Sequence, residues 1–197
     1  MNSNMQFFML SGGRSSRMGR NKALLMIAGE RLIERVLSAI PDRFREEAII
    51  VTNNPSDYDF IANRKLLDIK PGLGPIGGIH AGLSHATTDA CFFLACDFPY
   101  LTADTIERII HIYRGQDIFG AMTKHGEQTL CAIYSKRILP LVEKQIESGH
   151  YSLRELASLA STGWQEVDPE DTLFNLNTFD EYKKILASGR RNAEETR

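Results

Sequence analysis

The chain has 197 residues, of which 43% are hydrophobic and 24% charged, so it can bury a core without disulfides or structural metals. Its formal net charge of −2 gives no electrostatic reason to expect binding to nucleic acid or to a membrane. No apolar run approaches the roughly 18 residues of a membrane span. The N-terminus lacks a signal-peptide pattern and the three cysteines lack metal-type spacing, which predicts a cytoplasmic protein.

Short apolar runs alternate with amphipathic patterns along the chain. Residues 6–10 read as a buried strand, and 31–40 as a helix that stops at Pro41. The near-continuous apolar run at 90–97 is the clearest candidate for a central strand. Further strands are predicted at 47–52, 65–69, 116–123 and 128–135. Further helices are predicted at 76–86, at 102–113 with Thr102 as N-cap, and from Leu139. Two more helices should begin at the capping-box patterns 152–155 and 178–181.

This alternation predicts an α/β fold with three layers, in which helices cover both faces of a mostly parallel central sheet. The length indicates a single domain over 1–189, followed by a disordered tail at 190–197 that carries almost no apolar residue. Ligands of such sheets bind beyond the carboxyl ends of the strands. Functional residues are therefore expected in 10–22, in 52–54, and at Asp68 and Asp97.

The segment "LSGGRSSRMGRNKALL" (10–25) follows the first strand directly. Gly12 and Gly13 let the backbone approach a ligand, and Arg14, Arg17 and Lys22 could bind phosphate oxygens. The spacing fits neither the Walker A loop nor the dinucleotide fingerprint, which disfavours P-loop NTPases and Rossmann dehydrogenases. The alternative interpretation is a solvated basic loop.

Asp97 ends the strongly apolar strand, where a carboxylate is costly if it is buried without a partner. Its position at the sheet edge, near a candidate phosphate loop, favours a Mg²⁺ ligand over a simple turn residue. For Asp68, a turn residue is the strong alternative. We see no Ser-His-Asp or Cys-His arrangement, so nothing suggests covalent catalysis.

Taken together, these blocks resemble the molybdenum cofactor guanylyltransferase (MobA) family of the nucleotidyltransferase superfamily. The resemblance rests on the first loop and on "RLIERVL", "PGLGPIGGIHAGL", "ACDFPYL", "CAIYS", "GHYSLRELA" and "FNLNTFDEY", in the expected order over nearly the whole chain. It implies a nucleotide-binding half at 1–100 and an acceptor half at 101–189.

The resemblance also implies roles for individual residues. GTP would lie over the first loop, Lys22 and Arg17 would act on the phosphates, and Asp97 would hold Mg²⁺. The GTP-binding residues would be Leu10, Ser11, Gly12, Gly13, Lys22, one of Asn53 and Asn54, Asp68 and Asp97. The pterin-binding residues would be Ser152, Arg154, Asn175 and Asn177.

The implied reaction transfers GMP from GTP to the terminal phosphate of molybdopterin, with transient contacts to molybdenum-insertion proteins and acceptor apoenzymes. The glycine pair favours guanine, because related cytidylyltransferases look like "LAAG" there. Two residues depart from the family pattern: Ser11 replaces an alanine, and Asn21 stands where an acidic residue is common. The alternatives are a cytidylyltransferase for the same cofactor, a sugar-phosphate nucleotidyltransferase and a non-catalytic nucleotide-binding or carrier module.

Overall fold

A seven-stranded sheet forms the centre of the computed structural model, which describes residues 4–12, 21–168 and 170–194. Among these strands only β8 runs antiparallel to its neighbours, because it returns from β7 through a hairpin. The expectation of a mostly parallel sheet is confirmed. The strand order is β5 (Lys65–Leu66), β4 (Ile49–Val51), β1 (Met5–Leu10), β6 (Ala90–Ala95), β8 (Gly126–Ser135), β7 (Ile118–Thr123) and β9 (Thr162–Glu166).

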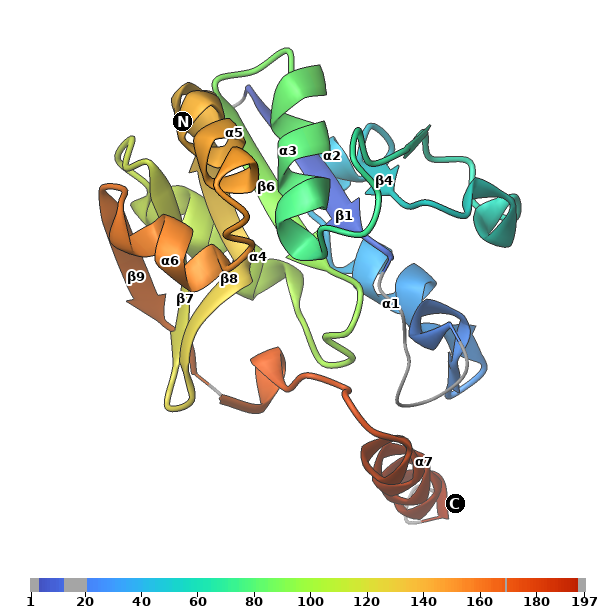
Figure 1. Cartoon of the computed structure of the whole chain (residues 1–197). Helices are drawn as coiled ribbons and strands as arrows, with labels where there is room; N and C mark the ends of the chain where they lie inside the picture. The colour runs from blue at the N-terminus through green and yellow to red at the C-terminus, as the bar shows by residue number, and fades with distance from the viewer. Residues whose placement is uncertain (1–3, 13–20, 169, 195–197) are drawn as a thin grey trace.

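Helices cover both faces of this sheet, as expected for three layers (Figure 1). The faces are separate because strand side chains alternate: Phe7 and Met9 belong to one apolar cluster, and Phe8 and Leu10 to the other. One face carries α3 (Pro75–His85), α5 (Leu139–Glu147) and α6 (Leu153–Ser158); the other carries α1 (Leu32–Ser38), α2 (Asp42–Arg45) and α4 (Ala103–Ile112).

Helix α3 lies unusually close to the sheet because two of its glycines face the strands. A Cβ on Gly78 would lie 2.8 Å from Leu10 Cδ2, and one on Gly82 would lie 2.5 Å from Phe93 Cε1. No side chain fits in these gaps without a shift of the neighbour. The close packing places the N-terminus of α3 beside the ends of β1 and β4, where the candidate site lies.

The predicted helix starts are confirmed. Thr102 accepts a hydrogen bond from the Thr105 N–H, and Ser152 accepts one from the Glu155 N–H. Helix α5 begins at Leu139 with proline in its first turn. At α7 (Phe179–Glu194) both halves of the capping box form, since the Thr178 N–H donates to Glu181 and the Glu181 N–H donates to Thr178.

The sequence analysis did not predict strand β9, helix α2, or the hairpin of β2 (Met26–Ile27) and β3 (Glu30–Arg31). The hairpin turns through Ala28 and Gly29, both at positive φ, which matches the twist of short hairpins. Helix α7 also continues to Glu194, into the segment expected to be a disordered tail. No described helix has the length and apolar character needed to cross a membrane.

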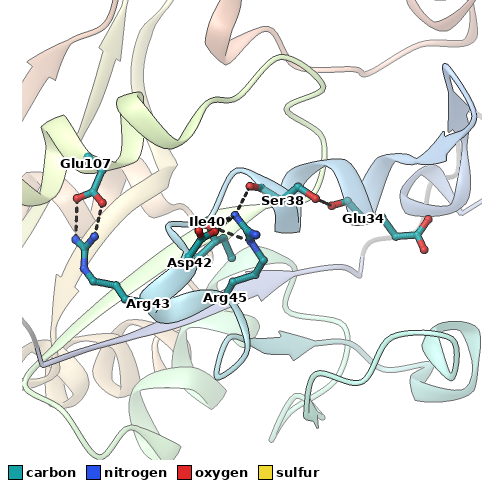
Figure 2. Close-up of polar contacts among 7 residues, drawn as sticks. All are labelled: Glu34, Ser38, Ile40, Asp42, Arg43, Arg45 and Glu107. Atoms are coloured by element: carbon teal, nitrogen blue, oxygen red, sulfur yellow. Dashed lines mark hydrogen bonds and ion pairs between the residues drawn. The ribbon is translucent and has the colours of Figure 1, made fainter.

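Arginine contacts fix helix α2 to its neighbours (Figure 2). The Arg45 guanidinium donates to the Ser38 and Ile40 carbonyl oxygens at the end of α1, and pairs with Asp42. Arg43 forms a bidentate pair with Glu107 of α4, which joins two helices on the same face. These contacts belong to the scaffold and lie apart from the strand ends described next.

Candidate active site

Four neighbouring strands end at the same level. Leu10 of β1 pairs with both Val51 of β4 and Ala95 of β6, and Val51 pairs with Leu66 of β5. The residues that follow these strands therefore share one edge of the sheet, as the sequence predicted. Two groups of polar side chains form there, one beyond β4 and β5 and the other beyond β6.

The first group, which we call the β4–β5 cluster, consists of Gly12, Asn53 and Asp68. Asn53 Nδ2 donates to Asp68 Oδ2 at 2.8 Å, and the Asp68 N–H donates back to Asn53 Oδ1 at 3.3 Å. A Cβ on Gly12 would lie 3.9 Å from the Thr52 Cα, so the exposed Gly12 backbone runs directly beside Asn53. The cluster is closed by its own hydrogen bonds before any ligand binds.

The second group, which we call the β6 cluster, consists of Lys22, Asp97 and Asn177. Asp97 Oδ1 is buried and has no hydrogen-bond partner among the described residues. Burial raises the pKa of Asp97, and the nearby positive charge of Lys22 offsets this shift only in part. A buried oxygen of this kind is costly. It marks a place where a ligand would restore the missing interactions.

The C-terminal segment completes the β6 cluster. The Leu176 N–H donates to the Asp97 carbonyl at 2.9 Å, and Lys22 Nζ donates to Asn177 Oδ1 at 3.3 Å. Burial raises the pKa of Glu181, but hydrogen bonds from the Asn177 and Thr178 N–H groups and the charge of Lys22 lower it more. Residues from the two ends of the chain thus surround Asp97.

Cys96 lies next to Asp97 but is not suited to act as a nucleophile. Burial, together with the negative charge of Asp97, raises the pKa of its thiol to about 12. The reactive form of cysteine is the thiolate, which is scarce at neutral pH under these conditions. Cys96 is therefore not a candidate nucleophile.

A hollow of about 300 Å³ adjoins the β6 cluster through Asn177. Its two walls are the β7–β8 hairpin and the segment before α7, and Asn175 Nδ2 joins them by donating to Gln128 Oε1 at 3.4 Å. It offers amide, hydroxyl and imidazole groups beside one aromatic ring. The lining residues are Thr123, Lys124, His125, Gln128, Leu173, Phe174, Asn175 and Asn177.

The other expected site residues lie in different environments. Leu10 is buried under α3, and Ser11 is buried with its hydroxyl turned toward Tyr58. Ser152 caps α6 and Arg154 is exposed on that helix; no described contact links either residue to the hollow. Gly13 and Arg17 lie outside the described residues, as does Arg14.

Sequence reasoning did not single out several residues of this region. Thr123, His125 and Gln128 come from a hairpin that showed no motif. Phe174 begins the block "FNLNTFDEY", but the resemblance implies no role for it. Glu181 is different, because the capping-box spacing from Thr178 identified it as a helix-start residue. That signal gave its structural role but not its position beside Lys22.

The residues present fit a Mg²⁺ ion held by a single protein carboxylate. The described part of the chain contains no group of three or more His, Cys, Asp or Glu residues that could enclose a metal by themselves. Mg²⁺ does not need such a cage, because it is commonly held by one or two carboxylates together with substrate phosphates and water. The unpartnered Asp97 oxygen has the chemistry that this arrangement requires.

Comparisons with known proteins place the chain in a family. The family model described as the MobA-like NTP transferase domain matches residues 8–164. A Clostridium perfringens protein named "Probable molybdenum cofactor guanylyltransferase" is 34% identical over 187 residues, covering 90% of this chain and 93% of its own. The molybdenum cofactor guanylyltransferase of Desulfosudis oleivorans is 33% identical over 195 residues, covering 91% and 93%.

A solved structure also shares the fold. The structure of molybdopterin-guanine dinucleotide biosynthesis protein A from Archaeoglobus fulgidus superposes with a TM-score of 0.80 at 24% identity, covering 94% of this chain and 99% of its own. The family match begins within β1 and ends within β9, so it includes every residue of the two clusters except Asn177. The chain therefore belongs to the MobA-like NTP transferase family of nucleotidyltransferases.

Proposed function

We propose that the protein transfers GMP from GTP to the terminal phosphate of molybdopterin, forming the guanine dinucleotide cofactor and releasing pyrophosphate. The observation that carries this proposal is the buried, unpartnered Asp97 oxygen beside Lys22, next to a hollow that can take an acceptor. The names of the relatives point to the same reaction. Nucleotidyl transfer brings two anions together, which requires positive charge at the place where this cluster lies.

The hollow is the proposed acceptor site. A pterin ring system presents several hydrogen-bond donors and acceptors on a flat apolar face. The side-chain amides of Asn175 and Gln128 suit its polar edge, and the ring of Phe174 suits its face. Asn177 touches both the hollow and Lys22, so the acceptor phosphate would reach the β6 cluster. Ser152 and Arg154 remain proposed pterin contacts at a separate position on α6.

The β4–β5 cluster is the proposed site for the nucleoside. Asp68 uses Oδ2 to accept from Asn53, and no described residue donates to its other oxygen. Guanine carries adjacent N–H donors, which a carboxylate can accept together. The bare backbone at Gly12 would leave space for the larger purine base. Leu10 and Ser11 would support this position from beneath.

The mechanism needs positioning and charge neutralisation. A phosphate oxygen of molybdopterin forms a bond to the α-phosphorus of GTP, and the bond from that phosphorus to the bridging oxygen of the β-phosphate breaks. The attacking phosphomonoester is already anionic near neutral pH, because its second pKa is about 6, so no protein base is required. Lys22 would bind the phosphates, and Asp97 would hold Mg²⁺, which when bound neutralises phosphate charge.

The decisive experiment measures pyrophosphate release with GTP, CTP and ATP in parallel, each with Mg²⁺ and with molybdopterin, a sugar phosphate or no acceptor. We expect release with GTP only when molybdopterin is present. Release with CTP at an equal or greater rate would identify a cytidylyltransferase instead. Release supported by a sugar phosphate but not by molybdopterin would identify the other transferase alternative. GTP binding without release under any condition would indicate a carrier module.

A further inference from the structure

Ser11 and Asn21, the two residues that depart from the family pattern, both donate hydrogen bonds to the buried Tyr58 hydroxyl. Tyr58 ends a short 3-10 helix, Pro55–Tyr58, that follows β4. Ser11 Oγ donates to the Tyr58 hydroxyl oxygen at 2.5 Å, and Asn21 Nδ2 donates to the same oxygen at 2.9 Å. The Tyr58 hydroxyl in turn donates to the Ser11 carbonyl at 3.3 Å. Both lone pairs and the proton of this hydroxyl are therefore used.

Both polar atoms of the Asn21 side chain form hydrogen bonds. Its amide nitrogen donates a second hydrogen bond to Asp57 Oδ2 at 3.1 Å, and its Oδ1 accepts from the Ala23 N–H at 3.2 Å. The last contact caps the 3-10 helix Lys22–Leu24, in which Lys22 is the first residue. An aspartate at position 21 could not donate to either partner, and its charge would face that of Asp57. The structure thus supplies a reason for asparagine here.

Tyr58 cannot touch a substrate itself. Its side chain is 1% exposed and that of Ser11 is 2% exposed, so both hydroxyl groups lie beneath the sheet edge. Burial raises the pKa of Tyr58 above its ordinary value, which keeps the hydroxyl protonated and able to donate. What the hydroxyl does control is the distance between Ser11, which is followed by Gly12, and Asn21, which is followed by Lys22.

We propose that the Tyr58 hydroxyl is a positioning group for nucleotidyl transfer, which holds Ser11 against Asn21 and so fixes Gly12 and Lys22 relative to each other. This rests on the proposed function, in which Gly12 faces the nucleoside and Lys22 the phosphates. One hydroxyl would set the spacing between the β4–β5 cluster and the β6 cluster. The Ser11–Tyr58–Asn21 contacts would then serve transition-state alignment in addition to stability.

The test compares Tyr58→Phe with a matched control. Tyr134 is equally buried, and its hydroxyl donates to the Thr129 carbonyl at 2.8 Å, but it pairs with Cys91 near the opposite end of β6. Both phenylalanine variants lose one hydroxyl and keep the ring. We expect Tyr58→Phe to lower kcat/KM for GTP about tenfold, mainly through kcat, and Tyr134→Phe to leave it within about twofold. Equal kinetic effects in the two variants would overturn the proposal.

A second pair of variants tests the role of Asn21. Asn21→Asp should reduce kcat by a similar factor, because it sets two carboxylates side by side. Adding Asp57→Asn should recover much of the loss, since the pair again has one donor and one acceptor. Failure of the double variant to recover would contradict the assigned Asn21–Asp57 contact. Ser11→Ala, which restores the residue common in the family, should cost less than Tyr58→Phe because it removes one hydrogen bond.

Failure of this proposal can be told apart from failure of the proposed function. If the wild-type protein releases no pyrophosphate with GTP and molybdopterin, the proposed function is wrong. The rate of deuterium exchange at the Ala23 amide, measured with and without GTP and Mg²⁺, then tests the positioning role. GTP should slow exchange in wild type and in Tyr134→Phe but not in Tyr58→Phe. An equal effect of GTP on exchange in all three proteins, including no effect, would overturn the positioning role independently of turnover.

Discussion

The β4–β5 cluster and the β6 cluster stand at the same edge of one sheet, but they differ in how their polar groups are satisfied. Asn53 and Asp68 exchange two hydrogen bonds with each other. Asp97 keeps a buried oxygen without a partner beside Lys22. The first arrangement is complete without a ligand, whereas the second stores an unfavourable interaction that a ligand can relieve.

This difference separates recognition from chemistry. A preformed cluster binds its ligand equally well in the ground state and in the transition state, which affects KM. A cluster with an uncompensated carboxylate gains most when charge is brought to it during reaction, which affects kcat. The two clusters should therefore respond to mutation in different kinetic parameters, KM for the β4–β5 cluster and kcat for the β6 cluster.

The largest effect is expected for Asp97→Ala. Loss of this carboxylate should lower kcat by roughly 10²–10³, the scale seen when a key charge-stabilising group is removed. Asp97→Asn, which keeps the shape, should not lower the melting temperature, because it removes a buried charge. Steady-state kinetics and thermal unfolding measure both. Asp89→Ala is the matched control, since this exposed carboxylate precedes the opposite end of β6 and should leave kcat unchanged.

Asp68→Asn should have a smaller effect, and it should change KM rather than kcat. The asparagine keeps an oxygen to accept from Asn53 but loses the charge offered to the base. We expect KM for GTP to rise about five- to tenfold, which corresponds to roughly 1 kcal/mol, while kcat stays within about twofold. The preference for GTP over CTP should shrink in parallel. A fall in kcat with unchanged KM would erase the proposed division between the clusters.

How far the sequence predicts this site depends on the range of the contacts. The sequence predicts a functional role for Asp97, because this carboxylate ends a buried strand at the sheet edge where ligands bind. Lys22 and Asn177 are 155 residues apart in the sequence, so no local pattern predicts their contact. The same holds for Tyr58, whose role depends on two residues that only the folded sheet brings together.

The fold shows the same limit. Strands β1 and β6 are buried on both faces, so their continuous apolar runs predict them from the sequence. Strand β9 is a partly exposed edge strand with the sequence "TGWQE", in which a glycine interrupts a polar run. Its pairing with β7 depends on the Phe119 ring, which fills the space that a side chain at Gly163 would occupy. Such complementarity cannot be seen from either segment alone.

The smallest predicted effect concerns Glu181, which caps α7 and lies within the electrostatic reach of Lys22. Glu181→Gln keeps an oxygen that can accept from the Asn177 and Thr178 N–H groups but loses the negative charge, so it should destabilise the protein at neutral pH by about 0.5 kcal/mol, the usual scale of a charge at a helix N-terminus. The folded-state pKa lies below the ordinary value of 4.5, so this stabilisation is present above that pH and is lost as the pH falls through the folded pKa. Chemical unfolding of both proteins across pH 3–7 should therefore give curves that converge in acid. A constant difference at all pH values would show that the carboxylate charge is not what holds α7 beside the β6 cluster.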